Sequence, residues 1–268
     1  MTKGATPKLS CMLWTLEGKA SLDSGLEIVA EAGYQGVELV GEFQKWSPAE
    51  LRRVVGRLRA LGLTVDAASG VKAGFAVPDP DGSFVAQVKA QLASMRELGC
   101  RRMILLSGPV MPGIVPETQR QIALENLTRA TDLAAAEKAE IVIEPIDVLE
   151  QPTVYLRSVS EAFALVQALR RPEVKVLYDL YHEQRGAGNL IEKLEANLDL
   201  VGLLHVADVP GRHEPGTGEI NFPEIYRRLA HRGYAGWIAM EFYPTGDPVT
   251  TLRAARFAAL QQWTRRET

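Results

Sequence analysis

The sequence predicts a (β/α)8 barrel that forms a single domain over residues 1–268. Eight short apolar segments alternate with helical patterns, and eight is the number of βα units in that fold. Most of these segments are nearly continuous apolar runs, which is typical of parallel strands covered on both faces. The length of 268 residues also suits one large α/β barrel.

The expected strands are separated by helices whose ends are marked in the sequence. In chain order, the strands are expected at 8–15, 36–41, 63–69, 101–107, 139–146, 174–181, 201–208 and 236–242. Ser47, Ser158 and Asn221 are each followed by glutamate three positions later, which indicates capped helix starts. Asp247 before Pro248 opens the last helix in the same way. Glycines mark expected helix ends at Gly33, Gly62, Gly99 and Gly233.

Two further stretches bear on the architecture. Segments 32–38 and 232–238 resemble each other, and each joins a helix end, a glycine turn and a strand start. This weak repeat favours an eightfold barrel over an open sheet. The loop 70–83 is rich in glycine, proline and aspartate and follows the third strand. We therefore expect it on the C-terminal face, either as a lid or as an ordinary surface loop.

Composition narrows the class of protein. Hydrophobic residues make up 46% and charged residues 24%, as in an ordinary globular protein. The net charge of −3 disfavours a nucleic-acid partner. The two cysteines, Cys11 and Cys100, are too few for a disulfide framework or a cysteine metal site. With a polar start and no apolar run of about 20 residues, we expect a cytoplasmic protein without a membrane partner.

The candidate site lies at the ends of the last four expected strands. Functional residues in such barrels cluster at the C-terminal ends of the strands. There the sequence places four residues with ligand-type side chains: Glu144, Asp179, His205 and Glu241. Taken singly, each would be a helix cap, an ion-pair partner or a core histidine. Together, three buried carboxylates need a compensating cation, and with one imidazole they predict a divalent metal such as Mn²⁺, Mg²⁺ or Co²⁺.

Three residues near these ligands are candidates for substrate binding. His182 is expected at the rim, where it would contact a substrate oxygen or stand as an exposed loop histidine. Glu150, in the loop after the fifth strand, would reach substrate or remain solvated. Arg212 would hold a carboxylate or hydroxyl of the substrate, since guanidinium binds oxyanions bidentately, or would form a surface pair with Glu214. In the loops after the first three strands the candidates are Trp14, Glu42, Lys72 and Phe75.

Four sequence segments resemble the xylose isomerase-like barrel superfamily, which includes sugar isomerases, ketose 3-epimerases, inosose dehydratases and endonuclease IV. They are IEPI (143–146), YDLYHEQ (178–184), ADVPGRHEPGTGEINFPEIY (207–226) and GYAGWIAMEFYP (233–244). Within the superfamily they are most similar to hydroxypyruvate isomerases. Two positions differ: hydroxypyruvate isomerases commonly carry glutamine where His205 stands, and Glu150 falls where ketose 3-epimerases place a substrate-binding glutamate.

The resemblance implies a metal-dependent isomerase, an intramolecular oxidoreductase, whose substrate is hydroxypyruvate (giving tartronate semialdehyde) or a related sugar acid. It implies Glu144 and Glu241 as the catalytic acid/base pair, His182 and Arg212 as substrate contacts, and a homo-oligomer, dimeric or tetrameric. The expected reaction is a proton shift through a cis-enediolate. The alternatives are a ketose 3-epimerase or dehydratase, an endonuclease IV-type phosphodiesterase and a non-catalytic sugar-binding or partner protein. The phosphodiesterase uses a trinuclear zinc cluster that needs many histidines, and this chain has four.

Overall fold

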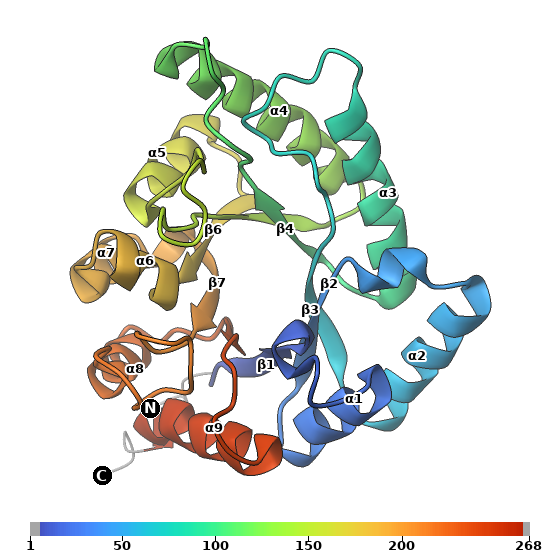
Figure 1. Cartoon of the computed structure of the whole chain (residues 1–268), viewed down its shortest axis with the longest axis vertical. Helices are drawn as coiled ribbons and strands as arrows, with labels where there is room; N and C mark the ends of the chain where they lie inside the picture. Colours follow the sequence, from blue (N-terminus) through green and yellow to red (C-terminus); the bar gives the residue numbers. More distant parts are fainter. Residues whose placement is uncertain (1–5, 265–268) are drawn as a thin grey trace.

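The structure, a computed structural model, describes residues 6–264, which form a closed barrel of parallel strands in sequence order (Figure 1). The strands are β1 (Lys8–Met12), β2 (Gly36–Val40), β3 (Thr64–Ser69), β4 (Arg102–Leu106), β5 (Glu140–Glu144), β6 (Val174–Asp179), β7 (Val201–Val206) and β8 (Trp237–Met240). Each strand lies inside its expected segment, and β8 pairs with β1 to close the sheet. The predicted (β/α)8 barrel is therefore confirmed.

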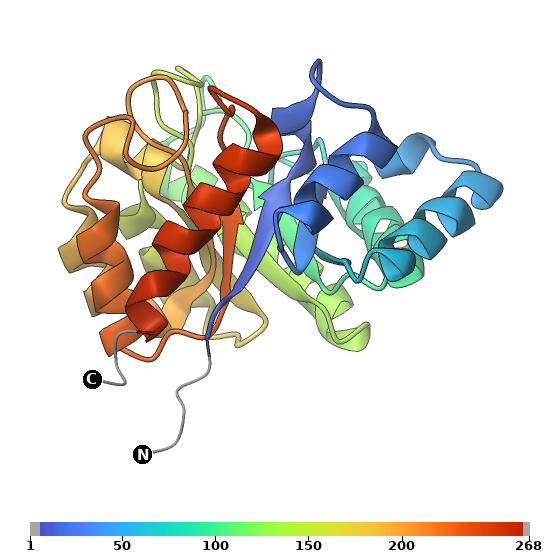
Figure 2. The ribbon, with the colours of Figure 1, turned by 90° about the horizontal axis from the view of Figure 1, so that it is seen from below.

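The helices surround the strands as an outer ring (Figure 1). They are α1 (Leu22–Glu31), α2 (Pro48–Ala60), α3 (Ser83–Leu98), α4 (Pro116–Ala136), α5 (Val159–Leu169), α6 (Leu180–Gly186), α7 (Leu190–Ala196), α8 (Phe222–His231) and α9 (Pro248–Thr264), with short 3-10 turns η1 (Leu13–Leu16), η2 (Glu42–Lys45) and η3 (Leu198–Leu200). Helix α9 packs against α8 and α1 beside the seam between β8 and β1 (Figure 2). Within residues 6–264 no helix combines the length and apolarity that a membrane span requires.

The expected helix boundaries have the local chemistry that the sequence indicated. The side chains of Ser47, Ser158 and Asn221 each accept a hydrogen bond from the backbone N–H three residues on. Asp247 Oδ1 accepts the N–H of Thr250 at 2.9 Å. These acceptors satisfy N–H groups that a helix start leaves without an intrahelical partner. The capping residues thus fix where four of the helices begin.

The barrel has an inner and an outer apolar core. The outer core packs the helices on the strands, while a smaller inner cluster takes one apolar side chain from each of seven strands. Its members are Met12, Ala67, Ile104, Val142, Leu177, Leu203 and Ala239. Burying a large apolar side chain contributes roughly 1.5–3 kcal/mol, so both layers hold the strands in register. Strand β2 adds no side chain to this inner cluster.

The middle of the loop 70–83 is packed on the end of β4. The N–H groups of Phe75 and Ala76 donate to the carbonyls of Leu106 and Ser107 at 3.2 and 2.9 Å. Gly74 lies so close to this strand end that a Cβ would fall 2.3 Å from the carbonyl oxygen of Ser107. Phe75 is fully buried in the outer core. This part of the loop is therefore fixed in the fold, and Phe75 packs there and does not line a lid.

Candidate metal centre

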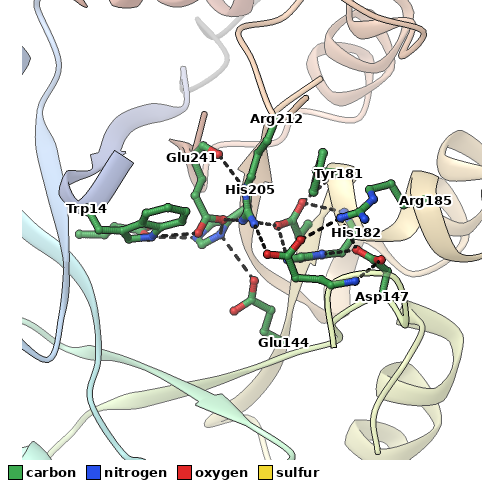
Figure 3. Close-up of polar contacts among 12 residues, drawn as sticks. Trp14, Glu144, Asp147, Tyr181, His182, Arg185, His205, Arg212 and Glu241 are labelled. Atoms are coloured by element: carbon green, nitrogen blue, oxygen red, sulfur yellow. Dashed lines mark hydrogen bonds and ion pairs between the residues drawn. The ribbon is translucent and has the colours of Figure 1, made fainter. Parts of the chain in front are cut away.

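The carboxyl ends of β5 to β8 bring the four predicted ligands into one buried cluster. Figure 3 labels three of them, Glu144, His205 and Glu241. Glu144 and Asp179 end β5 and β6, and Glu241 directly follows β8. His205 lies in β7, in register with Asp179. One ligand atom from each of the four residues lies within 4.8 Å of the others. The arrangement follows from four consecutive parallel strands that each end in a polar side chain at the same level.

His205 stands at the centre of the cluster. Its Nδ1 lies 2.7 Å from Oε2 of Glu241 and 3.8 Å from Oε1 of Glu144. Its Nε2 faces the opposite way and lies 2.9 Å from Oε2 of Glu38, a buried residue of β2. Although burial lowers the pKa of His205, the charges of Glu38 and Glu241 raise it well above the usual value. A metal ion at Nδ1 would therefore have to displace a proton from this ring.

The hydrogen bonding of Asp179 indicates that a cation could bind in the cluster. Its Oδ1 accepts the N–H groups of Tyr181 and His182 at 2.7 and 3.2 Å and so caps α6, which ends β6 two residues before the expected boundary. Its Oδ2 is buried and accepts no hydrogen bond. A buried carboxylate oxygen without a hydrogen bond is costly, and a bound cation would compensate it more directly than Arg212 and His182, which are each 3.6 Å away. Carboxylate oxygens and one imidazole nitrogen suit a hard or borderline divalent ion.

Arg212 lies over the cluster (Figure 3). Its Nη2 is 2.8 Å from Oε2 of Glu241 and 3.6 Å from Oδ2 of Asp179. Its guanidinium is 5.3 Å from the ring centre of Trp14 and 4.9 Å from that of Tyr181. The alternative of a surface pair with Glu214 is wrong, because Arg212 is buried and Glu214 binds Thr245 instead. The aromatic rings hold the guanidinium above the candidate ligands.

His182 lies just past the C-terminal end of β6 and is buried, so the alternative of an exposed loop histidine is wrong. The early end of β6 puts this histidine in the first turn of α6. Its Nδ1 lies 2.7 Å from Oδ2 of Asp147, and its Nε2 lies 3.6 Å from Oδ2 of Asp179. Burial lowers the pKa of His182, but Asp179 and Asp147 together raise it above the usual value. The Asp147 carboxylate fixes the ring so that Nε2 points toward the cluster.

Glu150 lies at the mouth of the site. Its side chain is 44% exposed, and its Oε2 accepts a hydrogen bond from Nη1 of Arg185 at 2.9 Å. Its Oε1 is 4.0 Å from Nη1 of Arg212. The carboxylate is thus partly solvated and also adjacent to the guanidinium over the cluster, so it combines features of both sequence expectations.

The two proposed catalytic carboxylates differ in their affinity for a proton. Burial and the charge of Glu241 raise the pKa of Glu144 to about 7. Burial acts in the same direction on Glu241, but Arg212 and His205 outweigh it and hold the pKa of Glu241 well below its usual range. Pairs of carboxyl groups whose environments separate their pKa values are suited to opposite roles in acid/base chemistry.

Sequence reasoning missed Glu38 and Asp147 and named Trp14 without a role. The indole Nε1 of Trp14 donates to Oε1 of Glu241 at 3.2 Å. The signal for Glu38 was an acidic residue inside the apolar run 36–41, and Asp147 stands just past the strand that ends in Glu144. Neither pattern indicates which residue the carboxylate contacts, because the partners, His205 and His182, belong to other βα units.

Comparison with known proteins places the chain in a family. Residues 26–266 match the model of the xylose isomerase-like TIM barrel family. The chain belongs to this family. Hydroxypyruvate isomerase of Escherichia coli K12 is 29% identical to it over 92% of this chain and 97% of the relative. The 2-oxo-tetronate isomerase of Cupriavidus necator is 30% identical over 80% and 84% of the two chains.

A solved structure agrees with this placement. The crystal structure of AP endonuclease, family 2, from Brucella melitensis has a TM-score of 0.85 and 27% identity, over 94% of this chain and 98% of the other. The predicted resemblance to the xylose isomerase-like TIM barrel family is confirmed, as is the prediction of an isomerase similar to hydroxypyruvate isomerase. The endonuclease IV alternative gains nothing from the cluster, which contains a single histidine.

Proposed function

We propose that the protein uses a divalent metal to isomerise a small hydroxy-carbonyl acid, with hydroxypyruvate (giving tartronate semialdehyde) as the first candidate. The observation that carries this proposal is the pair Glu144 and Glu241, which are buried together with Asp179 and His205 in one candidate metal cluster. The names of the two isomerase relatives support the substrate class.

Glu144, Asp179, His205 and Glu241 would hold the metal. Mn²⁺, Mg²⁺ and Co²⁺ each suit three carboxylates and one imidazole. The cluster contains no cysteine, which is the ligand typical of structural zinc sites. When bound, the ion polarises the substrate carbonyl as a Lewis acid and stabilises negative charge on its oxygen.

The proton transfer falls to the two glutamates. One of them removes the proton from the carbon next to the carbonyl, which leaves a cis-enediolate on the substrate. The same or the other carboxyl then delivers a proton to the neighbouring carbon. General acid/base catalysis of this kind contributes roughly 10²–10⁴-fold to the rate. Arg212 is ion-paired with Glu241, whereas Glu144 has no arginine partner among the contacts described, so the two carboxylates have different surroundings.

Arg212 and His182 would bind and orient the substrate. Arg212 contacts both Asp179 and Glu241, and its guanidinium can hold a carboxylate through two parallel hydrogen bonds. His182, fixed by Asp147, directs Nε2 toward the same space. Glu150 at the mouth would contact a distal hydroxyl. A substrate with a carboxylate and adjacent oxygens fits this set of groups.

A ketose 3-epimerase is the second candidate. It is favoured by His205, where hydroxypyruvate isomerases commonly have glutamine, and by the place of Glu150 beside Arg212. Two carboxylates that both reach the metal site also suit removal and return of a proton on different faces of one carbon. A screen of hydroxypyruvate, 2-oxo-tetronate and ketoses in D2O, with NMR of the products, separates the reactions by the position and stereochemistry of the deuterium.

The first prediction tests the two bases. Glu144→Gln and Glu241→Gln, each assayed with saturating Mn²⁺, should lower kcat at least about 100-fold on the substrate found in the screen, because each removes a proton carrier. Glu192→Gln, an exposed carboxylate of α7, serves as the control. Near wild-type turnover by either active-site variant would show that its carboxylate is not an essential base. EDTA should abolish activity, and added Mn²⁺ should restore it.

A further inference from the structure

A buried carboxylate that belongs to none of the four candidate ligands stands behind His205. Glu38 is fully buried, and its Oε2 lies 2.9 Å from Nε2 of His205. The other ring nitrogen, Nδ1, is the one that faces Glu241 and Glu144. The imidazole therefore lies between the cluster on one side and Glu38 on the other.

The course of β2 explains why Glu38 points into the barrel. Its neighbours Val37 and Leu39 pack in the outer core, so the residue between them faces the opposite side of the strand. The other seven strands each supply an apolar side chain to the inner cluster. A buried carboxylate at such a position costs several kcal/mol unless partners compensate it, which makes its contact with His205 the feature to explain.

A second buried acid, Asp66, lies on the next strand and has partners of its own. Asp66 Oδ2 accepts a hydrogen bond from Ser10 Oγ at 2.9 Å, and Oδ1 is ion-paired with Arg102. Burial and the charge of Glu38 raise the pKa of Asp66 to about 8. The contacts described for Asp66 thus run to Ser10 and Arg102, and those of Glu38 run to His205.

We infer that Glu38 is a positioning residue for the metal: it accepts the Nε2–H of His205 and thereby presents the lone pair of Nδ1 to Glu144, Asp179 and Glu241. A neutral imidazole carries one N–H and one lone pair, and an ionised carboxylate can only accept a hydrogen bond. When a cation displaces the proton at Nδ1, Glu38 holds the remaining proton on Nε2 and so fixes the tautomer that binds through Nδ1. The inference rests on the proposed metal site and adds a residue that touches neither metal nor substrate.

Glu38→Gln tests the inference by Mn²⁺ binding, measured by titration calorimetry on metal-free protein. The substitution keeps the size of the side chain but offers an amide N–H₂ as well as an oxygen, so it no longer enforces the Nε2–H tautomer. We expect Mn²⁺ to bind roughly 10–100-fold more weakly. Glu183→Gln is the matched control: Glu183 is equally buried, but it binds the N–H of Val159 and the ammonium of Lys193. Its Mn²⁺ affinity should stay within about threefold of wild type.

A double-mutant cycle with His205→Gln shows whether Glu38 acts through the histidine. In the His205→Gln background, Glu38→Gln should cause little further loss of Mn²⁺ affinity, because there is no imidazole left to orient. Losses that simply add would overturn the inference, since additivity marks independent sites. If wild type itself binds no Mn²⁺, the proposed function fails; if wild type binds it and Glu38→Gln binds it equally well, only the role of Glu38 fails.

A measurement on the wild-type chain covers the case in which Glu38→Gln does not fold. In protein labelled with ¹⁵N-histidine and saturated with Mg²⁺, the His205 ring should carry its proton on Nε2, and the Nδ1 resonance should shift on metal addition. A proton on Nδ1 in the Mg²⁺-saturated protein would overturn the inference.

Discussion

Glu241 shows how several neighbours fix one reactive side chain. Its Oε2 meets Nδ1 of His205 at 2.7 Å and Nη2 of Arg212 at 2.8 Å. Its Oε1 accepts the indole N–H of Trp14 at 3.2 Å. Donors to both oxygens favour the ionised form, in keeping with its lowered pKa, and they also restrict rotation of the carboxylate. Trp14 is the neighbour whose hydrogen bond can be removed while an aromatic ring stays in place.

Trp14→Phe should lower kcat/KM by about tenfold with little change in melting temperature. A hydrogen bond to a charged group is worth about 1.5–3 kcal/mol, and the phenyl ring keeps much of the contact with Arg212 and with Tyr243. Steady-state kinetics and thermal melting measure the two effects. Trp46→Phe, which changes a tryptophan packed edge-on against Phe43, is the control. An unchanged kcat/KM would mean that the indole N–H does not position Glu241.

At the scale of the elements, the loop after β7 is organised by one aspartate. Asp208 is fully buried and accepts four backbone N–H groups: Oδ1 binds those of Val209 and Ile220, and Oδ2 binds those of Gly216 and Gly218, at 2.9–3.1 Å. Its own carbonyl accepts the N–H of Arg212 at 3.1 Å. A Cβ at Gly218 would lie 2.0 Å from the carbonyl oxygen of Val209, so only glycine fits there. The loop that carries Arg212 is therefore built around this carboxylate.

Asp208→Ala should cost about 2–4 kcal/mol of stability, because it leaves several buried N–H groups without an acceptor. The amides at 216, 218 and 220 should exchange with D2O much faster than in wild type, and KM should rise as Arg212 loses its fixed position. Urea unfolding, hydrogen exchange and kinetics measure these effects. Thr217→Ala, an exposed change in the same loop, should alter none of them. Unchanged exchange at these amides would contradict the role of Asp208.

The strands and the four candidate ligands could be predicted because their signals are local. An apolar run that ends in Glu144 or Asp179 predicts a strand, and it also predicts that this last side chain lies at the C-terminal end of the barrel. Strand β6 ends two residues before the expected boundary. Leu180 and Tyr181 continue the apolar run, and only the capping hydrogen bonds of Asp179 show that a helix has begun. Local patterns thus gave the elements, while their exact boundaries depended on side-chain hydrogen bonds.

At the scale of the whole molecule, barrel closure makes contacts that no local pattern contains. Glu38 on β2 meets His205 on β7, and these strands are not neighbours in the sheet. Asp147 meets His182 only because the loop after β5 folds over the start of α6. The sequence showed acidic residues at these positions, but which side chains they meet depends on how the barrel closes. The clustering of the four candidate residues on adjacent strands could therefore be predicted, and the contacts with Glu38 and Asp147 could not.

The effect of Asp66 on stability depends on the packing of several strands, because its partners Ser10 and Arg102 come from β1 and β4. The ordinary pKa of an aspartate is about 4, and in the fold the pKa of Asp66 is raised to about 8. Between these values the folded chain keeps a proton that the unfolded chain releases. Stability from this group is therefore complete below pH 4 and is lost as pH rises toward 8, by up to about 1.4 kcal/mol per pH unit.

Asp66→Asn removes this titration, so its stability relative to wild type should improve steadily from pH 5 to pH 8. Urea unfolding in EDTA at each pH, which keeps metal binding out of the comparison, measures the difference in free energy of unfolding. Asp23→Asn, an exposed ion-pair partner of Arg53, controls for the general effect of losing one carboxylate. A difference between Asp66→Asn and wild type that stays constant over this range would mean that Asp66 is already ionised in the fold. In that case the inner barrel would hold two adjacent negative charges, with Arg102 paired to Asp66 and His205 paired to Glu38.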